Sequence, residues 1–146
     1  MTALARISAV FIALAATLAL SAPARSEAAC AEDDFESFLT EFQNNPSEQE
    51  NMSADQIEMT TFQEMGSAMP ARFTVVQSKE ELDWPILPSL AALKQQDLSV
   101  QIFQDTPLKA ELYARATDLL EVDFVWYFEK DPCWSFVGFS DGSLYR

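Results

Sequence analysis

The residue types best suited to acid–base and nucleophilic catalysis are scarce in this chain of 146 residues. It contains no histidine, the side chain that serves most often as a general base and as a metal ligand. Ser-His-Asp and Cys-His mechanisms are therefore excluded, together with zinc sites that depend on histidine. The three glycines, Gly66, Gly138 and Gly142, are too scattered to form a phosphate-binding loop.

Carboxylates are the remaining candidates for catalysis or metal binding. A pair of them could hydrolyse a glycoside, and Asp118, Glu121 and Asp123 lie close together in the sequence. However, the chain has 23 Asp and Glu residues, so neighbouring acids are expected on any solvated face. The acids at 32–34 and the segment 140–143 do not match the calcium loop of an EF-hand. We therefore expect no metal, no cofactor and no identifiable catalytic residue, which favours a protein that is not an enzyme.

Aromatic residues are better candidates for a binding site, because Trp and Tyr combine a flat apolar ring with a polar group. Five of them could line a pocket or pack in the core: Trp84, Tyr113, Trp126, Tyr127 and Trp134. We expect Tyr113 and Trp126 to contact a ligand, together with Phe124, because they lie within predicted strands. Trp134 directly follows Cys133 and is expected to pack over a disulfide.

Helices that could support these residues are predicted at three places, and a capping-box pattern at 78–81 indicates a further helical turn. Residues 31–44 have apolar side chains at helical spacing, with acids at 32–34 near the start and Pro46 after the end. A capping-box pattern at 47–50 indicates a second short helix, and residues 89–96 indicate a third that begins at Ser89. The apolar stripe of the first helix consists of Phe35, Phe38, Leu39 and Phe42.

Strands are predicted by β-branched and alternating residues at 56–62, 72–77, 99–104, 109–117, 121–129 and 133–139. Residues 109–117 could instead form a helix that begins at Thr106 and Pro107, but their alternation favours a strand. Helices followed by a run of strands predict an α+β fold, with N-terminal helices packed on one face of a curved antiparallel sheet.

The first 28 residues have the features of a secretory signal peptide. Arg6 precedes an apolar run over 9–20, and small residues follow it. The run is shorter than the roughly 20 residues that span a membrane. We expect cleavage after Ala28, with cleavage after Ala24 as the alternative. The predicted organisation is a signal peptide over 1–28 and a single domain over 29–146, which would be soluble and either periplasmic or secreted.

Cys30 is either a lipid attachment point or half of a disulfide. A bacterial lipoprotein signal has an apolar residue three positions before its cysteine, and this chain has Glu27 there. The other cysteine is Cys133, and two cysteines in an exported chain favour one disulfide between them. Two unpaired thiols, or pairing between two chains, are the alternatives.

The net charge of −14 at pH 7 limits the kinds of partner. A strongly negative protein repels phosphate backbones and anionic lipids, so we expect neither nucleic acid nor a membrane surface as a partner. A basic protein is an admissible partner, because opposite charges steer association. Solubility alone is a sufficient reason for the excess of acid.

Two segments of the chain resemble a known family. Residues 35–42 (FESFLTEF) and 122–144 (VDFVWYFEKDPCWSFVGFSDGSL) are similar to the opening helix and the closing hairpin of the NTF2-like cone fold. More narrowly, they resemble exported NTF2-like domains of the DUF4348 type, over about residues 30–50 and 100–144. The resemblance implies a bent sheet wrapped around helices, with a pocket on its concave face. NTF2-like enzymes usually place an Asp with a His or Tyr there, and a dyad with His is absent from this chain.

These observations lead to two expected functions. The first is an exported, non-catalytic binding module of NTF2-like type that holds a small apolar ligand or a peptide. The alternative is an acidic inhibitor or immunity-type protein that binds a basic periplasmic toxin or hydrolase. The missing histidine and the aromatic strands favour the first function, whereas the negative charge and small size permit the second.

Overall fold

The computed structural model describes residues 30, 32–63, 66, 70–116 and 123–142. The signal peptide predicted over 1–28 lies outside these residues, as do Asp118 and Glu121. In chain order the elements are α1 (Phe35–Asn44), β1 (Ser53–Gln63), β2 (Ala71–Ser78), a 3₁₀ turn η1 (Lys79–Glu81), α2 (Leu90–Gln95), β3 (Leu98–Thr106), β4 (Lys109–Ala116), β5 (Asp123–Lys130) and β6 (Trp134–Asp141). An α+β fold is therefore confirmed, and residues 109–116 form a strand as their alternation predicts.

Helix α1 begins later than predicted because of its capping residue. The Asp34 side chain accepts a hydrogen bond from the Ser37 backbone N–H at 2.9 Å, so Asp34 lies just outside the helix. This bond favours the ionised carboxylate and lowers the pKa of Asp34. The predicted apolar stripe is confirmed, since its four residues are buried. The helix predicted at 47–50 is wrong, because residues 46–52 form turns that lead into β1.

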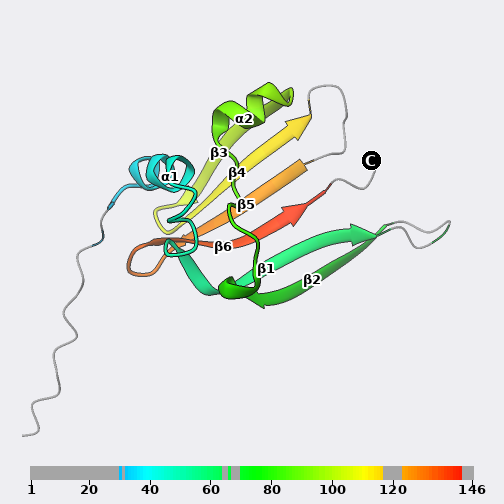
Figure 1. Cartoon of the computed structure of the whole chain (residues 1–146), viewed down its shortest axis with the longest axis horizontal. Helices are drawn as coiled ribbons and strands as arrows, with labels where there is room; N and C mark the ends of the chain where they lie inside the picture. The colour runs from blue at the N-terminus through cyan, green and yellow to red at the C-terminus, as the bar shows by residue number, and fades with distance from the viewer. Residues whose placement is uncertain (1–29, 31, 64–65, 67–69, 117–122, 143–146) are drawn as a thin grey trace, which may run out of the picture.

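The six strands form one sheet in the order β2-β1-β6-β5-β4-β3, which is not closed into a barrel (Figure 1). The prediction of an antiparallel sheet is wrong at one pair. Strands β1 and β6 run parallel, with Met59 beside Phe139 and Thr60 beside Ser140, and the other pairs are antiparallel. Alternation of apolar residues identifies a strand but not the direction of its neighbour, so the mixed pairing could not be inferred from the pattern.

One face of the sheet, called the covered face here, carries the helices (Figure 1). The Phe42 ring of α1 lies 5.6 Å from the Phe128 ring and 5.9 Å from the Phe136 ring, measured between ring centres. Helix α2 packs on β3 and buries Leu93. Together with the segment 82–89, these helices enclose the hydrophobic core.

A buried glutamine fastens the turn after α1 to the segment before α2. The Gln49 side-chain amide donates to the Leu87 carbonyl at 2.8 Å, and the Leu87 backbone N–H donates back to Gln49 Oε1 at 3.0 Å. Gln49 and Leu87 are 0% and 1% exposed, so each polar group needs such a partner. The Ser53 hydroxyl also donates to the Gln49 carbonyl, at 2.6 Å.

Cys30 and Cys133 form the predicted disulfide, with their Cα atoms 5.3 Å apart. The bond joins the residues just before α1 to the turn just before β6, across a sequence separation of 103. The described residues include no free cysteine, so the alternatives of unpaired thiols and of a lipid on Cys30 are wrong for this structure. Next to it, Lys130 Nζ lies 2.5 Å from Asp33 Oδ1 and adds an ion pair between the same two regions.

Candidate binding site on the open face of the sheet

Strand β4 separates two kinds of side chain onto the two faces of the sheet. Ala110, Leu112 and Ala114 are at most 1% exposed and belong to the core on the covered face. Their neighbours Glu111 and Tyr113 point to the opposite side, because successive residues of a strand alternate. We call this second side the open face, since neither α1 nor α2 packs on it (Figure 1).

A hollow of about 410 Å³ lies on the open face over β3 and β4. Strand pairing explains its composition, because Gln101 is opposite Tyr113 and Phe103 is opposite Glu111. Cross-strand pairs in an antiparallel sheet point to the same face, so these side chains gather in one place. The lining residues are Ser99, Gln101, Phe103, Asp105, Glu111, Tyr113 and Arg115.

Tyr113 is held in place by its neighbour Glu111. The Tyr113 hydroxyl donates a hydrogen bond to Glu111 Oε2 at 2.6 Å. This bond is the main cause that raises the pKa of Tyr113 to about 12, with smaller contributions from burial and from the charge of Glu111. The phenol therefore stays neutral across the physiological range and acts as a hydrogen-bonding group rather than as a base.

The hollow combines aromatic rings with carboxylates. The Phe103 and Tyr113 rings meet edge to face, with their centres 5.2 Å apart. Glu111 and Asp105 supply negative charge beside these rings, and Arg115 supplies one positive charge. Ring faces and carboxylates both attract ammonium and guanidinium groups. The arrangement is suited to binding a cationic side chain.

A second hollow, of about 380 Å³, lies over β2, β1, β6 and β5 on the same face. Tyr127, Arg72 and Glu58 are among its lining residues, and burial is the main cause that raises the pKa of Tyr127. Gly138 allows β1 and β6 to approach closely here, because a Cβ at this position would lie 3.1 Å from the Glu58 carbonyl oxygen. This hollow provides a second tyrosine in a similar setting.

The structure does not bring the three predicted ligand-binding residues together. Trp126 is opposite Leu112 in the sheet and lies on the covered face, where it is 2% exposed. Its indole N–H donates to the Ile86 carbonyl at 3.2 Å. Phe124 lies on that face too, with its ring stacked 6.2 Å from the Phe139 ring. Tyr113 is on the open face, so the site predicted from it and Trp126 is divided by the sheet.

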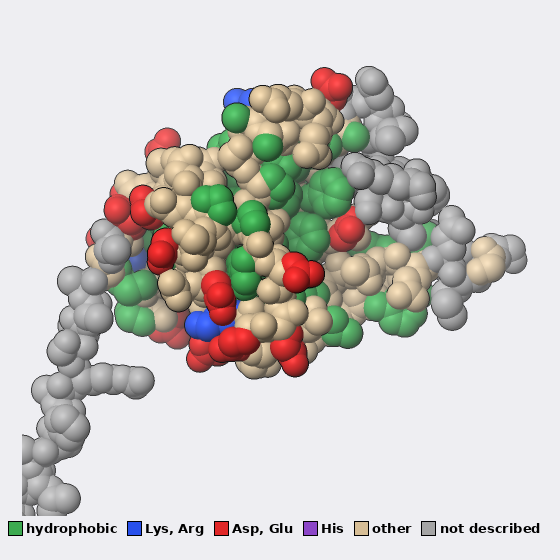
Figure 2. All heavy atoms as spheres, viewed as in Figure 1, with side chains coloured by type: hydrophobic (Ala, Val, Ile, Leu, Met, Phe, Trp, Pro, Cys, Tyr) green, Lys and Arg blue, Asp and Glu red, His purple; other side chains and the backbone are tan. Residues whose placement is uncertain are grey.

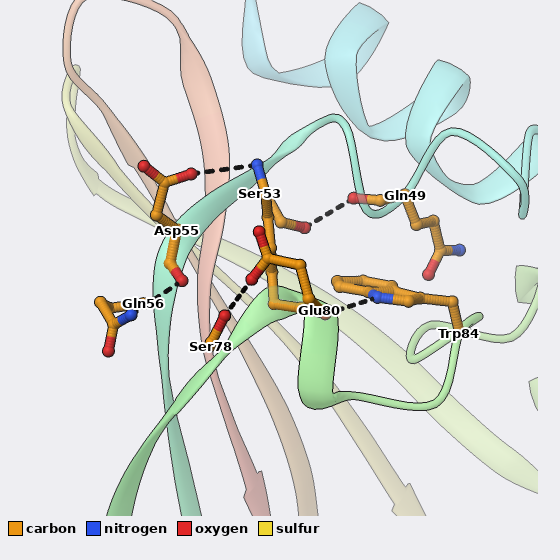
Figure 3. A network of polar contacts seen from close by, with 8 residues as sticks. Gln49, Ser53, Asp55, Gln56, Ser78, Glu80 and Trp84 are labelled. Atoms are coloured by element: carbon orange, nitrogen blue, oxygen red, sulfur yellow. Dashed lines mark hydrogen bonds and ion pairs between the residues drawn. The ribbon is translucent and has the colours of Figure 1, made fainter.

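Trp84 and Trp134 also pack within the fold and do not line the hollow around Tyr113. The Trp84 indole N–H donates to the Lys79 carbonyl at 2.9 Å, within the network of Figure 3, and its ring meets the Phe136 ring edge-on. Trp134 is 4% exposed, and its ring centre lies 4.9 Å from that of Phe35. It borders the same small hollow as both cysteines, as expected from its place beside Cys133.

Sequence reasoning identified only Tyr113 among the seven residues that line the hollow. Two of the residues that it missed, Glu111 and Phe103, show why. Glu111 was recognisable in principle, because it lies two positions before Tyr113 on the same strand and must share its face. Phe103 depends on the register between β3 and β4, which is set by the turn after Thr106 and by a shift in pairing between Phe103 and Thr106. That register is a property of the paired strands and has no single-strand signal.

Within the described residues, no group of three or more His, Cys, Asp and Glu side chains is placed to hold a metal ion. The same residues include no helix that is long and apolar enough to cross a membrane. Comparisons with protein-family models, with curated proteins and with solved structures find no match to this chain.

Proposed function

We propose that this protein is an exported, non-catalytic binding module of the NTF2-like type, which binds an extended basic peptide segment on the open face of its sheet. The observation that carries the proposal is the hollow around Tyr113, where two aromatic rings lie beside the carboxylates of Glu111 and Asp105. A lysine or arginine of the peptide would lie over the rings and pair with a carboxylate.

A peptide suits the geometry better than the small apolar ligand that the sequence also suggests. The lining of the hollow includes Ser99 and Gln101, whose hydroxyl and amide can pair with a peptide backbone. A small apolar ligand would be expected on the covered face, but Trp126 and Phe128 are at most 2% exposed there. Such a ligand would first have to displace these packed side chains.

Export and the NTF2-like type are supported by two features. The Cys30–Cys133 disulfide is typical of proteins in oxidising compartments such as the periplasm or the extracellular space. Helices on one face of a six-stranded sheet agree with the bent sheet around helices that the resemblance implies. We therefore propose a periplasmic or secreted product with residues 29–146 as its single domain.

The alternative function, an acidic inhibitor of a basic toxin or hydrolase, is favoured by charge. The chain has a net charge of −14, and Figure 2 shows Asp and Glu side chains spread widely over the visible face with few Lys or Arg. Such a surface would attract a basic protein without using the hollow around Tyr113. The two functions therefore predict different residues as the main contacts.

Calorimetric titration with a decapeptide of alternating Lys and Phe, and with one of alternating Glu and Phe, tests the proposal. We expect only the Lys peptide to bind, and Tyr113→Ala to weaken this binding about tenfold because the ring contact is lost. Phe73→Ala is the matched control, since Phe73 is an exposed aromatic residue outside the hollow and on the other side of the sheet, and it should bind like the wild type. Equal binding of both peptides, or no effect of Tyr113→Ala, would contradict the proposal. The inhibitor function would be favoured if Glu36→Gln on α1 weakened the binding and Tyr113→Ala left it unchanged.

A further inference from the structure

Strand β2 forms one margin of the sheet and presents an unpaired edge. Among the described strands it pairs only with β1, and Figure 1 shows it at the lower border of the sheet. Residues 72–76 are exposed in succession, so neither face of the strand is covered. Three large apolar residues are among them, with exposed fractions of 41% for Phe73, 55% for Val75 and 59% for Val76.

This edge lacks the usual protection against pairing with another strand. Proteins protect edge strands with proline, lysine, bulges or very short length. Strand β2 has eight residues, contains no Pro or Lys, and pairs with β1 over eight consecutive positions without a shift in register. Its single charged residue is Arg72, near the start. An exposed, regular and apolar edge of this kind can continue its sheet with a further strand.

A second copy of the chain is the occupant that the sequence of β2 fits. An antiparallel pair of identical strands related by a two-fold axis matches donors and acceptors automatically. The chain has a net charge of −14, so two copies repel each other except where acidic residues are absent, and β2 contains no acidic residue. This strand is therefore a place where two copies can meet without opposing carboxylates within the strand pair.

We propose that this protein forms a two-fold symmetric dimer in which β2 pairs antiparallel with β2 of a second copy, centred on Thr74. In this register Phe73 of each copy faces Val75 of the other, on the side of the sheet that carries the helices. Aromatic and β-branched residues are favourable cross-strand partners, and here the pair occurs twice. Arg72 faces Val76, so the two guanidinium groups are not opposite each other. The two sheets join into one continuous sheet.

The charge of the two copies gives the dimer a recognisable salt dependence. Added salt screens the repulsion between two chains of net charge −14, so the dimer should become tighter as the NaCl concentration rises. A basic partner on the same edge would show the opposite dependence, because salt weakens attraction between opposite charges. Salt therefore separates self-association from capture of a basic strand, and also from the peptide binding proposed for the hollow around Tyr113.

Sedimentation velocity of the oxidised protein over a range of protein and NaCl concentrations is the first test. We expect a monomer–dimer equilibrium that shifts toward the dimer with salt. Val75→Lys should raise the dimer dissociation constant at least about tenfold, because each copy then places an ammonium group opposite Phe73. Ile102→Lys on the other edge strand, β3, is the matched control, since Ile102 is 47% exposed, and it should not change the constant. A wild-type monomer at every condition, or equal effects of both variants, would overturn the proposal.

Cysteine crosslinking tests the register. With Thr74→Cys in both chains, the two new thiols lie next to each other across the two-fold axis. Mild oxidation should therefore give a disulfide-linked dimer on a non-reducing gel. Gln101→Cys, an exposed position on β3, should remain monomeric. Crosslinking at Val75→Cys in place of Thr74→Cys, or at Gln101→Cys to the same extent, would overturn the proposed centre of symmetry. Circular dichroism of each variant checks that it is folded.

Discussion

The two faces of the sheet differ in how their aromatic residues are used. On the covered face, rings pack against rings, as in the contacts of Phe42 with Phe128 and Phe136. On the open face, Tyr113 contacts the Phe103 ring, but it also donates a hydrogen bond to the carboxylate of Glu111 and is only partly buried. Adjacent residues of one strand therefore have different roles, since Leu112 packs in the core and Tyr113 borders a hollow.

This difference indicates that the residues that stabilise the fold and the residues available for binding lie on different faces of the sheet. The covered face is stabilised by buried apolar area, by the bridge between Gln49 and Leu87, and by the disulfide that fastens the start of α1. The side chains that line the hollow on the open face are partly or fully exposed, so their replacement should lower the free energy of unfolding less than replacement of a core residue.

The largest effect is expected from the disulfide, which ties the helical layer to the sheet. Replacing both Cys30 and Cys133 with Ser should lower the free energy of unfolding by about 4–5 kcal/mol, because the reduced chain loses a constraint across a long loop. Guanidinium chloride unfolding, followed by circular dichroism, measures this change. A loss below about 1 kcal/mol would show that the helical layer is held by packing alone.

A matched pair of alanine variants in β4 tests the division directly. Leu112→Ala should lower the free energy of unfolding by about 2–5 kcal/mol, because Leu112 is fully buried and its removal leaves a cavity. Tyr113→Ala should cost less than about 1 kcal/mol, because its ring is partly solvated. Both are measured by the same denaturant titration, and equal losses would contradict a separate binding face.

Much of the fold could be predicted from the sequence, because its signals are local. The apolar stripe of α1, the role of Ser89 as the cap of α2 and the alternation of β4 each depend on a few neighbouring residues. The Ser89 side chain, for example, accepts a hydrogen bond from the Ala92 backbone N–H at 3.2 Å. The parallel pairing of β1 with β6 was not predicted, because it joins segments about 80 positions apart and has no local signal.

The candidate site could be predicted only in part. Alternation shows that Trp126 shares a face with Phe124 and Phe128, but it does not show which residues of β4 share that face. The pairing of Leu112 with Trp126 shows that Leu112 shares the face of Trp126, and it therefore places Tyr113 on the other face. Whether helices cover a given face is also a tertiary property, so the open face could not be recognised before the fold was known.

The smallest and most specific effect concerns the ionisation of Tyr113. Its pKa is about 12 in the folded protein, chiefly because of the hydrogen bond to Glu111, against an ordinary value of 10.0. A pKa that is raised by folding adds stability at pH values below the pKa of the unfolded chain. This stability is lost as the pH rises from about 10 through about 12. Glu111→Gln should lower the pKa of Tyr113 toward 10, because the charged acceptor is lost.

A titration followed by phenolate absorbance measures this ionisation. Tyr113→Phe identifies the signal of Tyr113 by difference, while circular dichroism shows over which pH range the protein stays folded. If Tyr113 titrates near 10 in the wild type, or if Glu111→Gln leaves its pKa unchanged, the bond between the two side chains does not persist in solution. The open face would then lack the fixed tyrosine on which the proposed peptide site depends, whereas the covered face and its stability would be unaffected.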